Sequence, residues 1–285
     1  MANITTAFVK QFGSNLDALV QQKGSQLRNA VRIESGVVGE EAYFDQLAAT
    51  AAQRKTTRNS DTPLVKSDHR RRRVTMYDYE WADLIDKQDK LKMLIDPQSM
   101  YATNAAWALG RSMDDAIIDA FYADAATGKA GTGTAEFTPA NIIAESAAGM
   151  SLAKLLEAKE LLDAADCDPN EERYVIVTAG QVTDLLNTTE VKDADYNSVR
   201  ALVAGKLETF LGFRFIRTQR LDLSGTSRRC MAYVKSGMLL ALADEVQTRI
   251  DERSDKSYAT QVYAKMGIGS TRMEEAKCVA ILCKE

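Results

Sequence analysis

The chain has 285 residues, of which 45% are hydrophobic, so it can bury the core of one large domain or two smaller ones. Its 36 Lys and Arg residues face 40 Asp and Glu residues, and the net charge of −4 argues against a molecule that attracts nucleic acid as a whole. No apolar stretch approaches the roughly 20 residues that span a bilayer, and the start lacks the basic and apolar regions of a signal peptide. We therefore expect a globular protein of the cytosol with no membrane partner.

The cysteines are scattered and include no C-x-x-C pair, which is the spacing typical of zinc knuckles and redox sites. Reduced thiols are expected in this compartment. The sequence thus predicts neither a disulfide framework nor a metal site for Cys167, Cys230, Cys278 and Cys283.

The first predicted element is an amphipathic helix over residues 4–22. Phe8, Phe12, Leu16 and Leu19 recur at spacings of three and four residues and form one apolar stripe. Such a terminal helix either docks on its own domain or lies across a neighbouring subunit, and the sequence leaves both arrangements open.

The next distinctive segment is polar and runs over residues 50–68, with too few apolar side chains to form a core of its own. It is followed by residues 70–81, which are rich in β-branched and aromatic residues and predict a strand. Together these segments predict a long hairpin that projects from the body of the protein.

A long helix is predicted to start at Asp96 and Pro97, because Asp caps free amides and Pro at the first position loses no hydrogen bond. Its pattern continues to Gly128, which gives a length of about 45 Å at 1.5 Å per residue. Gly110 inside this helix costs about 1 kcal/mol relative to Ala and suggests close packing there. Its apolar face includes Met113, Ile117 and Phe121.

Beyond the glycine-rich turn at 128–133, helices and strands alternate, which predicts a compact α/β lobe. The helices are expected over 151–165, 182–186 and 198–210, and the strands over 173–178 and 213–217. The last part predicts antiparallel strands that pack beside the long helix, over 231–235, 245–252, 258–265 and 276–283. The sequence as a whole therefore predicts an α+β fold.

Few residues suggest catalysis. His69 is the one histidine, and its setting among arginines in a polar loop favours a solvated residue over a catalytic base. The turn at 127–134 has Ala130 where a phosphate-binding loop needs Ser or Thr, which favours a plain turn. Asp115 and Asp119 share a helix face, yet two carboxylates alone make a weak cation site. Adjacent carboxylates such as Glu274 and Glu275 are expected at the solvated surface. We predict no catalytic, cofactor or metal site.

Four consecutive arginines, Arg70 to Arg73, are the sharpest local feature. They can neutralise phosphates, pair with acidic residues on a neighbouring subunit, or protect a solvated strand edge from aggregation, and the sequence leaves all three interpretations open. The excess of acidic residues elsewhere favours a protein partner, since complementary charge fixes the register between identical subunits.

The order and lengths of these parts cover nearly the whole chain and resemble the tailed-bacteriophage major capsid proteins with the Hong Kong 97-like capsid fold. Short phrases resemble this family as well. They are Phe8-Val9-Lys10-Gln11-Phe12, Gln22-Lys23-Gly24-Ser25, Ile85-Asp86-Lys87 before Asp96-Pro97, and Gly267-Ile268-Gly269.

The resemblance implies a division into four parts. Residues 1–49 would be an N-terminal arm and 50–82 the extended loop. A peripheral domain with a long spine helix would comprise 83–140 and 243–285, and an axial domain 141–242. No long N-terminal scaffolding extension is recognised, so we expect scaffolding, where needed, from a separate protein or a segment cleaved earlier.

The resemblance also implies a function, which is self-assembly into hexamers and pentamers of an icosahedral phage head that encloses double-stranded DNA. The partners would be further copies of the chain and a portal protein, with scaffolding and cement proteins as optional partners. Such a protein is assembled in the host cytoplasm, resides in the virion and is not an enzyme. The alternatives are a nanocompartment shell of the same fold and a cytosolic enzyme using the central α/β lobe.

Two groups of residues are expected at subunit contacts. We expect the arm to contribute Phe8, Phe12 and Leu16, and the extended loop to contribute Arg70, Arg71, Arg72, Arg73 and Tyr77. Reversing the four arginines to Glu is expected to leave a folded subunit that no longer forms shells.

Overall fold

The computed structural model of the chain describes residues 21–59, 61, 62, 64–85, 98–187 and 209–285. It divides into two compact units. Unit 1 comprises Met1–Ser25, Asp78–Ser112 and Glu245–Met266, and unit 2 comprises Gln26–Tyr77, Met113–Asp244 and Gly267–Glu285.

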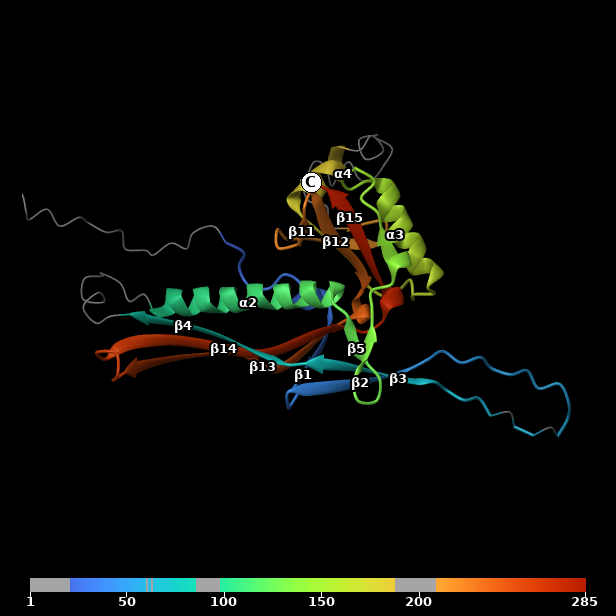
Figure 1. The fold of residues 1–285 in the computed structure, drawn as a ribbon, viewed down its shortest axis with the longest axis horizontal. Coiled ribbons are helices and arrows are strands. Elements are labelled where there is room, and N and C mark those ends of the chain that lie inside the picture. Colours follow the sequence, from blue (N-terminus) through green and yellow to red (C-terminus); the bar gives the residue numbers. More distant parts are fainter. Residues whose placement is uncertain (1–20, 60, 63, 86–97, 188–208) are drawn as a thin grey trace, which may run out of the picture. The chain divides into compact units, whose positions relative to one another are not determined.

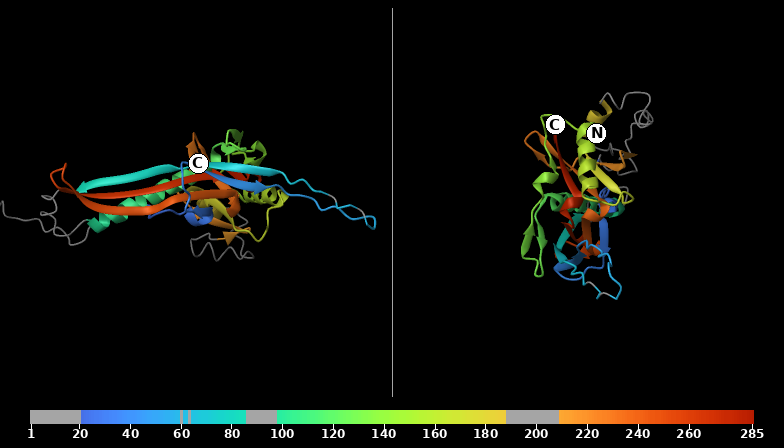
Figure 2. Two further views of the ribbon diagram at one scale, coloured as in Figure 1. Left: turned by 90° about the horizontal axis from the view of Figure 1, so that it is seen from below. Right: turned by 90° about the vertical axis from the view of Figure 1, so that its right-hand side faces the viewer.

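A four-stranded sheet has the order β1 (Arg32–Ser35), β13 (Met238–Arg253), β14 (Ala259–Arg272) and β4 (Tyr77–Ile85). Unit 1 holds residues 78–85, 245–253 and 259–266 of its long strands. Within this unit, Tyr263 of β14 donates a hydrogen bond to Glu80 of β4 at 2.7 Å. The first part of helix α2 (Gln98–Tyr122) runs along one face of these strands (Figures 1 and 2). Within unit 1, Val262, Ala264 and Met266 of β14 are buried.

Unit 2 contains a larger sheet, in the order β7 (Ile142–Ile143), β15 (Cys278–Lys284), β12 (Ser227–Val234), β8 (Arg173–Val177), β10 (Phe213–Arg217) and β9 (Thr209–Phe210), with β11 (Leu223–Ser224) paired to β12. All five residues of β8 are buried, as expected for a central strand. Helices α3 (Leu152–Ala164) and α4 (Ala179–Asn187) accompany this sheet. The Ser151 hydroxyl accepts a hydrogen bond from the amide of Lys154 and so caps α3.

A second sheet of unit 2 has the order β2 (Glu41–Leu47), β3 (His69–Thr75), β5 (Ala125–Thr127) and β6 (Gly133–Ala135). Residues 48–68 join β2 to β3 and extend beyond the ends of both strands (Figures 1 and 2). Short 3₁₀ helices complete the described structure, at Arg28–Ala30, Pro139–Asn141, Lys235–Gly237 and Glu275–Lys277.

The α+β class is confirmed, and so are the elements with the clearest periodicity. The predicted helix at 151–165 and the strand at 213–217 match α3 and β10. Of the late strands, β12, β13 and β14 are longer than expected, and β15 begins at Cys278 and not at residue 276. The apolar face of α2 is buried at Met113, Ile117 and Phe121, as predicted.

Three predictions about elements were wrong. The strand expected over 70–81 is two strands, because the Met76 amide donates to the Glu40 carbonyl at 2.8 Å between them and β3 and β4 join different sheets. The long helix ends at Tyr122, about 37 Å from its first described residue, because residues 125–127 pair with β3 instead. Thr209 and Phe210 form a strand and not a helix end. The helix start at Asp96 and the remainder of the helix predicted over 198–210 lie outside the described residues.

Candidate assembly surface

The segment between β2 and β3 forms a surface that its own subunit leaves uncovered. We call residues 48–68 the projecting loop. The Ala48 amide donates to the Asp68 carbonyl at 2.9 Å and closes its base, and every described residue from 49 to 68 is exposed. Leu64 is 89% exposed. The loop therefore buries almost none of its apolar surface within the subunit.

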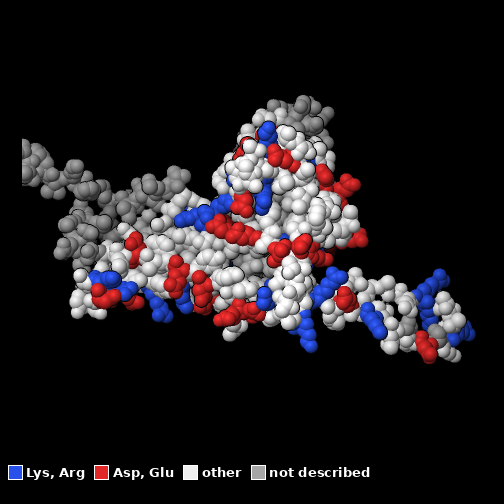
Figure 3. All heavy atoms as spheres, in the orientation of Figure 1, with Lys and Arg blue, Asp and Glu red and all other residues white. Residues whose placement is uncertain are grey.

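The projecting loop is also basic. Between residues 50 and 68 it carries four cations, Arg54, Lys55, Arg58 and Lys66, against two carboxylates, Asp61 and Asp68, which leaves two positive charges. Figure 3 shows Lys and Arg side chains gathered over this part of the molecule. A partner that covers the loop should therefore present acidic or polar groups beside apolar ones.

The arginines that follow the loop point alternately to the two faces of β3. Arg71 pairs with Asp45 at 2.6 Å and Arg73 with Glu41 at 2.7 Å, both across to β2. The Arg71 guanidinium holds the pKa of the Asp45 carboxyl below its ordinary value, chiefly by hydrogen bonding to it. These pairs are solvated, so each is worth at most about 1 kcal/mol, and exchanging such a pair for a contact with another chain costs little.

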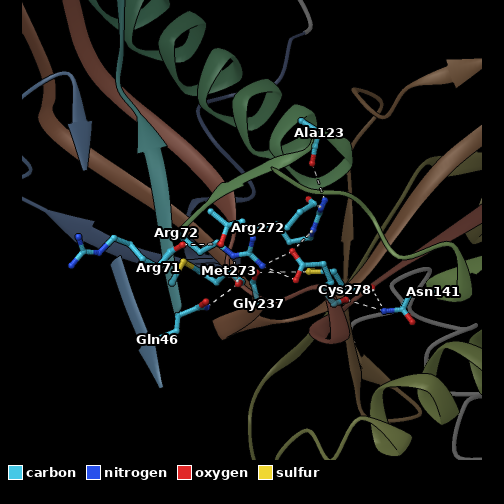
Figure 4. Close-up of polar contacts among 12 residues, drawn as sticks. Gln46, Arg71, Arg72, Ala123, Asn141, Gly237, Arg272, Met273 and Cys278 are labelled. Carbon is cyan, nitrogen blue, oxygen red and sulfur yellow. Dashed lines mark hydrogen bonds and ion pairs between the residues drawn. The ribbon is translucent and has the colours of Figure 1, made fainter. Parts of the chain in front are cut away.

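Arg72 differs from its neighbours because its side chain is buried. Its Nη2 donates to both oxygens of Glu275 at 2.6 Å, and its Nε donates to the Met273 carbonyl at 2.9 Å. Gln46 of β2 donates to the same carbonyl at 2.8 Å (Figure 4). Arg72 and Gln46 thus fasten the two strands that carry the projecting loop to the turn after β14.

Arg272, the last residue of β14, is a second buried arginine beside this turn, and sequence reasoning missed it. Its Nη1 donates to the carbonyls of Phe121 and Ala123 at 2.6 and 3.0 Å, and its guanidinium lies 4.9 Å from the ring centroid of Phe137. Burial lowers the pKa of Arg272. Its Nε lies 3.6 Å from the Glu275 carboxylate, which therefore faces two arginines. A single arginine after a β-like run gives no sequence signal of this role.

Two expectations about charged residues require correction. Glu275 is not a solvated surface carboxylate, because it is the partner of buried Arg72. Reversing Arg72 to Glu would place two carboxylates together in a partly buried site, so reversal of all four arginines would not leave an intact fold.

The remaining predicted contact residues are either exposed or outside the described residues. The Arg70 side chain is 70% exposed and lies 3.4 Å from Asp68, and Tyr77 is 61% exposed. His69 is an exposed strand residue opposite Leu47. Phe8, Phe12 and Leu16 lie outside the described residues.

None of the described helices is long and apolar enough to cross a membrane. A comparison with curated proteins finds no match.

Solved structures match over the full length of the chain, which shows the fold. The capsid of cyanophage P-SCSP1u is 12% identical with a TM-score of 0.77, covering 100% of this chain and 95% of that chain. A structure from Mycobacterium phage Che8 is 16% identical with a TM-score of 0.69, and the match covers 96% of this chain and 97% of that chain. The cyanophage Pam1 capsid is 15% identical with a TM-score of 0.67, and the match covers 100% of this chain and 99% of that chain.

A family model described as phage capsid protein matches residues 4–285, which is nearly the entire chain. The chain belongs to the phage capsid protein family and is a phage major capsid protein, a structural subunit of an icosahedral head with the Hong Kong 97-like fold.

Proposed function

We propose that this subunit assembles into hexamers and pentamers that close into a head around double-stranded DNA. The observation that carries the proposal is the projecting loop, whose described residues from 49 to 68 are all exposed. Apolar area that such a loop buries against a neighbour stabilises assembly by about 25 cal/mol per Å². Many modest contacts of this kind give a stable shell while each contact can still be corrected during assembly.

The proposed contacts fall into two groups. The arm, residues 1–49, contributes Phe8, Phe12 and Leu16. The extended loop, residues 50–82, contributes Arg70, Arg71, Arg73 and Tyr77, while Arg72 serves as its anchor. We assign 83–140 and 243–285 to the peripheral domain and 141–242 to the axial domain.

The wider partners follow from enclosing packaged DNA. We propose a portal protein as the partner through which DNA enters, the packaged DNA as a partner of the inner face, and scaffolding and cement proteins as optional partners of particular assembly stages. The net charge of −4 is compatible with a shell that holds DNA loosely.

Replacing residues 51–66 by a short Gly-Ser linker tests the role of the projecting loop. Because the loop contributes so little to the interior of its subunit, the variant should keep a wild-type circular dichroism spectrum and melting temperature. It should sediment as small species and show no closed shells in electron micrographs. Shells of normal size from this variant would refute the proposal.

A variant that conserves the charges of the loop serves as a control. Arg54→Lys with Arg58→Lys keeps the positive charges in place. It should assemble like the wild type, and its failure would show that the contacts need the guanidinium groups of Arg54 and Arg58 and not their charge alone.

A further inference from the structure

A hollow of about 520 Å³ lies beside β3, between the strand and the turn after β5. We call it the β3 hollow. The ionisable residues that line it, apart from His69, are Arg70, Arg71, Arg72 and Lys129 against Asp45 and Glu275. Four cations against two carboxylates leave two positive charges.

Both carboxylates of the hollow are already engaged. Asp45 pairs with Arg71 and Glu275 with Arg72, at 2.6 Å in each case. The positive charges that remain belong to Arg70 and Lys129. Arg70 forms only a solvated pair with Asp68 at 3.4 Å, and the Lys129 ammonium group pairs with no carboxylate of the described chain.

Backbone hydrogen bonds hold Lys129 beside β3. The Gly128 amide donates to the Arg71 carbonyl at 3.2 Å, and the Thr127 hydroxyl donates to the same carbonyl at 3.0 Å. A Cβ on Gly131 would come within 2.5 Å of the Arg73 side chain, so the turn packs directly on that strand. The exposed cation at Lys129 is therefore presented from a fixed turn.

Strand β4 carries the complementary charge. Its nine residues, Tyr77–Ile85, include Asp78, Glu80 and Asp83 and no Lys or Arg, and none of the three carboxylates forms an ion pair within the described chain. The strand lies at the edge of its sheet. Asp78 and Glu80 are exposed and lie on the same face, about 7 Å apart at the usual rise of a strand.

We infer that Asp78 and Glu80 of a second copy of this chain enter the β3 hollow and pair with Lys129 and Arg70. The inference rests on the proposed self-assembly and names one of its contacts. A second copy is favoured over nucleic acid because the chain is acidic overall and supplies a strand of matching charge itself.

Zero-length crosslinking tests this contact in assembled wild-type shells. One batch of subunits carries light nitrogen and another carries heavy nitrogen, and the two batches are mixed and then assembled into shells without DNA. A carbodiimide then joins lysine amines to adjacent carboxylates. We expect peptides that link Lys129 to Asp78 or Glu80, in light–heavy pairs. Links from Lys129 to other carboxylates only, links confined to one chain, or no Lys129 link while other lysines react between chains would each overturn the inference.

Two substitutions at position 129 provide matched variants. Lys129→Arg removes the amine and should abolish the crosslink while shells still form. Lys129→Glu should raise the subunit concentration needed for assembly by about tenfold, as expected from the loss of one close charge pair. Equal assembly of the two variants would contradict the inference.

The outcome also separates this inference from the proposed function. If the wild type forms no shells under any condition, self-assembly itself fails. If shells form only with DNA and Lys129 reacts with no carboxylate of another chain, the β3 hollow faces nucleic acid and the inferred contact is wrong.

Discussion

Asp114 of helix α2 accepts a hydrogen bond from the backbone amide of Leu27 at 3.1 Å, and the same carboxylate accepts one from the amide of Gln26 at 3.0 Å. Asp114 and Leu27 are both completely buried. The carboxylate therefore holds the chain where it leaves the N-terminal segment. Asp114→Ala should leave two amides without acceptors and lower the free energy of unfolding by about 3 kcal/mol, measured by urea denaturation of unassembled subunits.

Asp124→Ala is the control for this substitution, because Asp124 is exposed just beyond the same helix. It should change the free energy of unfolding by no more than about 0.5 kcal/mol. Equal effects of the two substitutions would show that the hydrogen bonds of Asp114 to the Gln26 and Leu27 amides do not stabilise the subunit.

Gly110 should be intolerant of the smallest side chain. A Cβ there would lie 2.6 Å from the Ser25 nitrogen and 2.7 Å from Gly24, both backbone contacts that cannot yield cheaply. In an isolated helix Gly110→Ala would stabilise by about 1 kcal/mol. In this protein we expect Gly110→Ala to destabilise the subunit and to lower its melting temperature in differential scanning calorimetry. A higher melting temperature than that of the wild type would disprove the close approach at Gly110.

Glu275 should matter far more than its neighbour Glu274. Glu275→Gln leaves the buried guanidinium of Arg72 without its counterion and should cost about 3 kcal/mol of subunit stability in urea titrations. Glu274→Gln removes only a solvated pair with Lys277 and should cost less than about 1 kcal/mol. Similar losses for both would mean that Glu275 is not an anchor.

Two aspartates should respond to pH with opposite signs. The hydrogen bond from Arg71 lowers the pKa of Asp45, so its ionisation adds stability that is present above its ordinary value of 3.8 and is lost as the pH falls. Burial, with Asp222 and Asp115 nearby, raises the pKa of Asp119, so its ionisation removes stability as the pH rises.

At pH 7, therefore, Asp45→Asn should destabilise the subunit and Asp119→Asn should stabilise it. Both differences from the wild type should fade well below pH 3.8, in denaturation curves recorded across the pH range. Differences of the same sign at pH 7 would contradict these assignments.

Periodicity was sufficient to predict the elements whose side chains alternate between core and solvent. The long helix, α3 and the late strands show this pattern, and Gly110 indicates the close packing against the backbone of Gly24 and Ser25. Strand β1 gave no such signal, because its four residues are mostly polar and acquire their structure by pairing with β13, more than 200 positions away.

The arginine run shows where sequence reasoning fails at the candidate assembly surface. Four identical side chains in a row look equivalent, yet alternation along β3 sends Arg71 and Arg73 to the solvated face and Arg72 to the Met273 carbonyl and Glu275. The burial of Arg72 depends on a turn 201 residues further along the chain. No local pattern reveals that distance.

Electron cryomicroscopy of shells formed by the purified chain tests the central claim most directly. The account predicts closed shells in which the projecting loop of each subunit lies against a neighbouring subunit and β3 stays fastened through Arg72. A persistent monomer at high concentration, or shells in which the loop touches no other subunit, would contradict it.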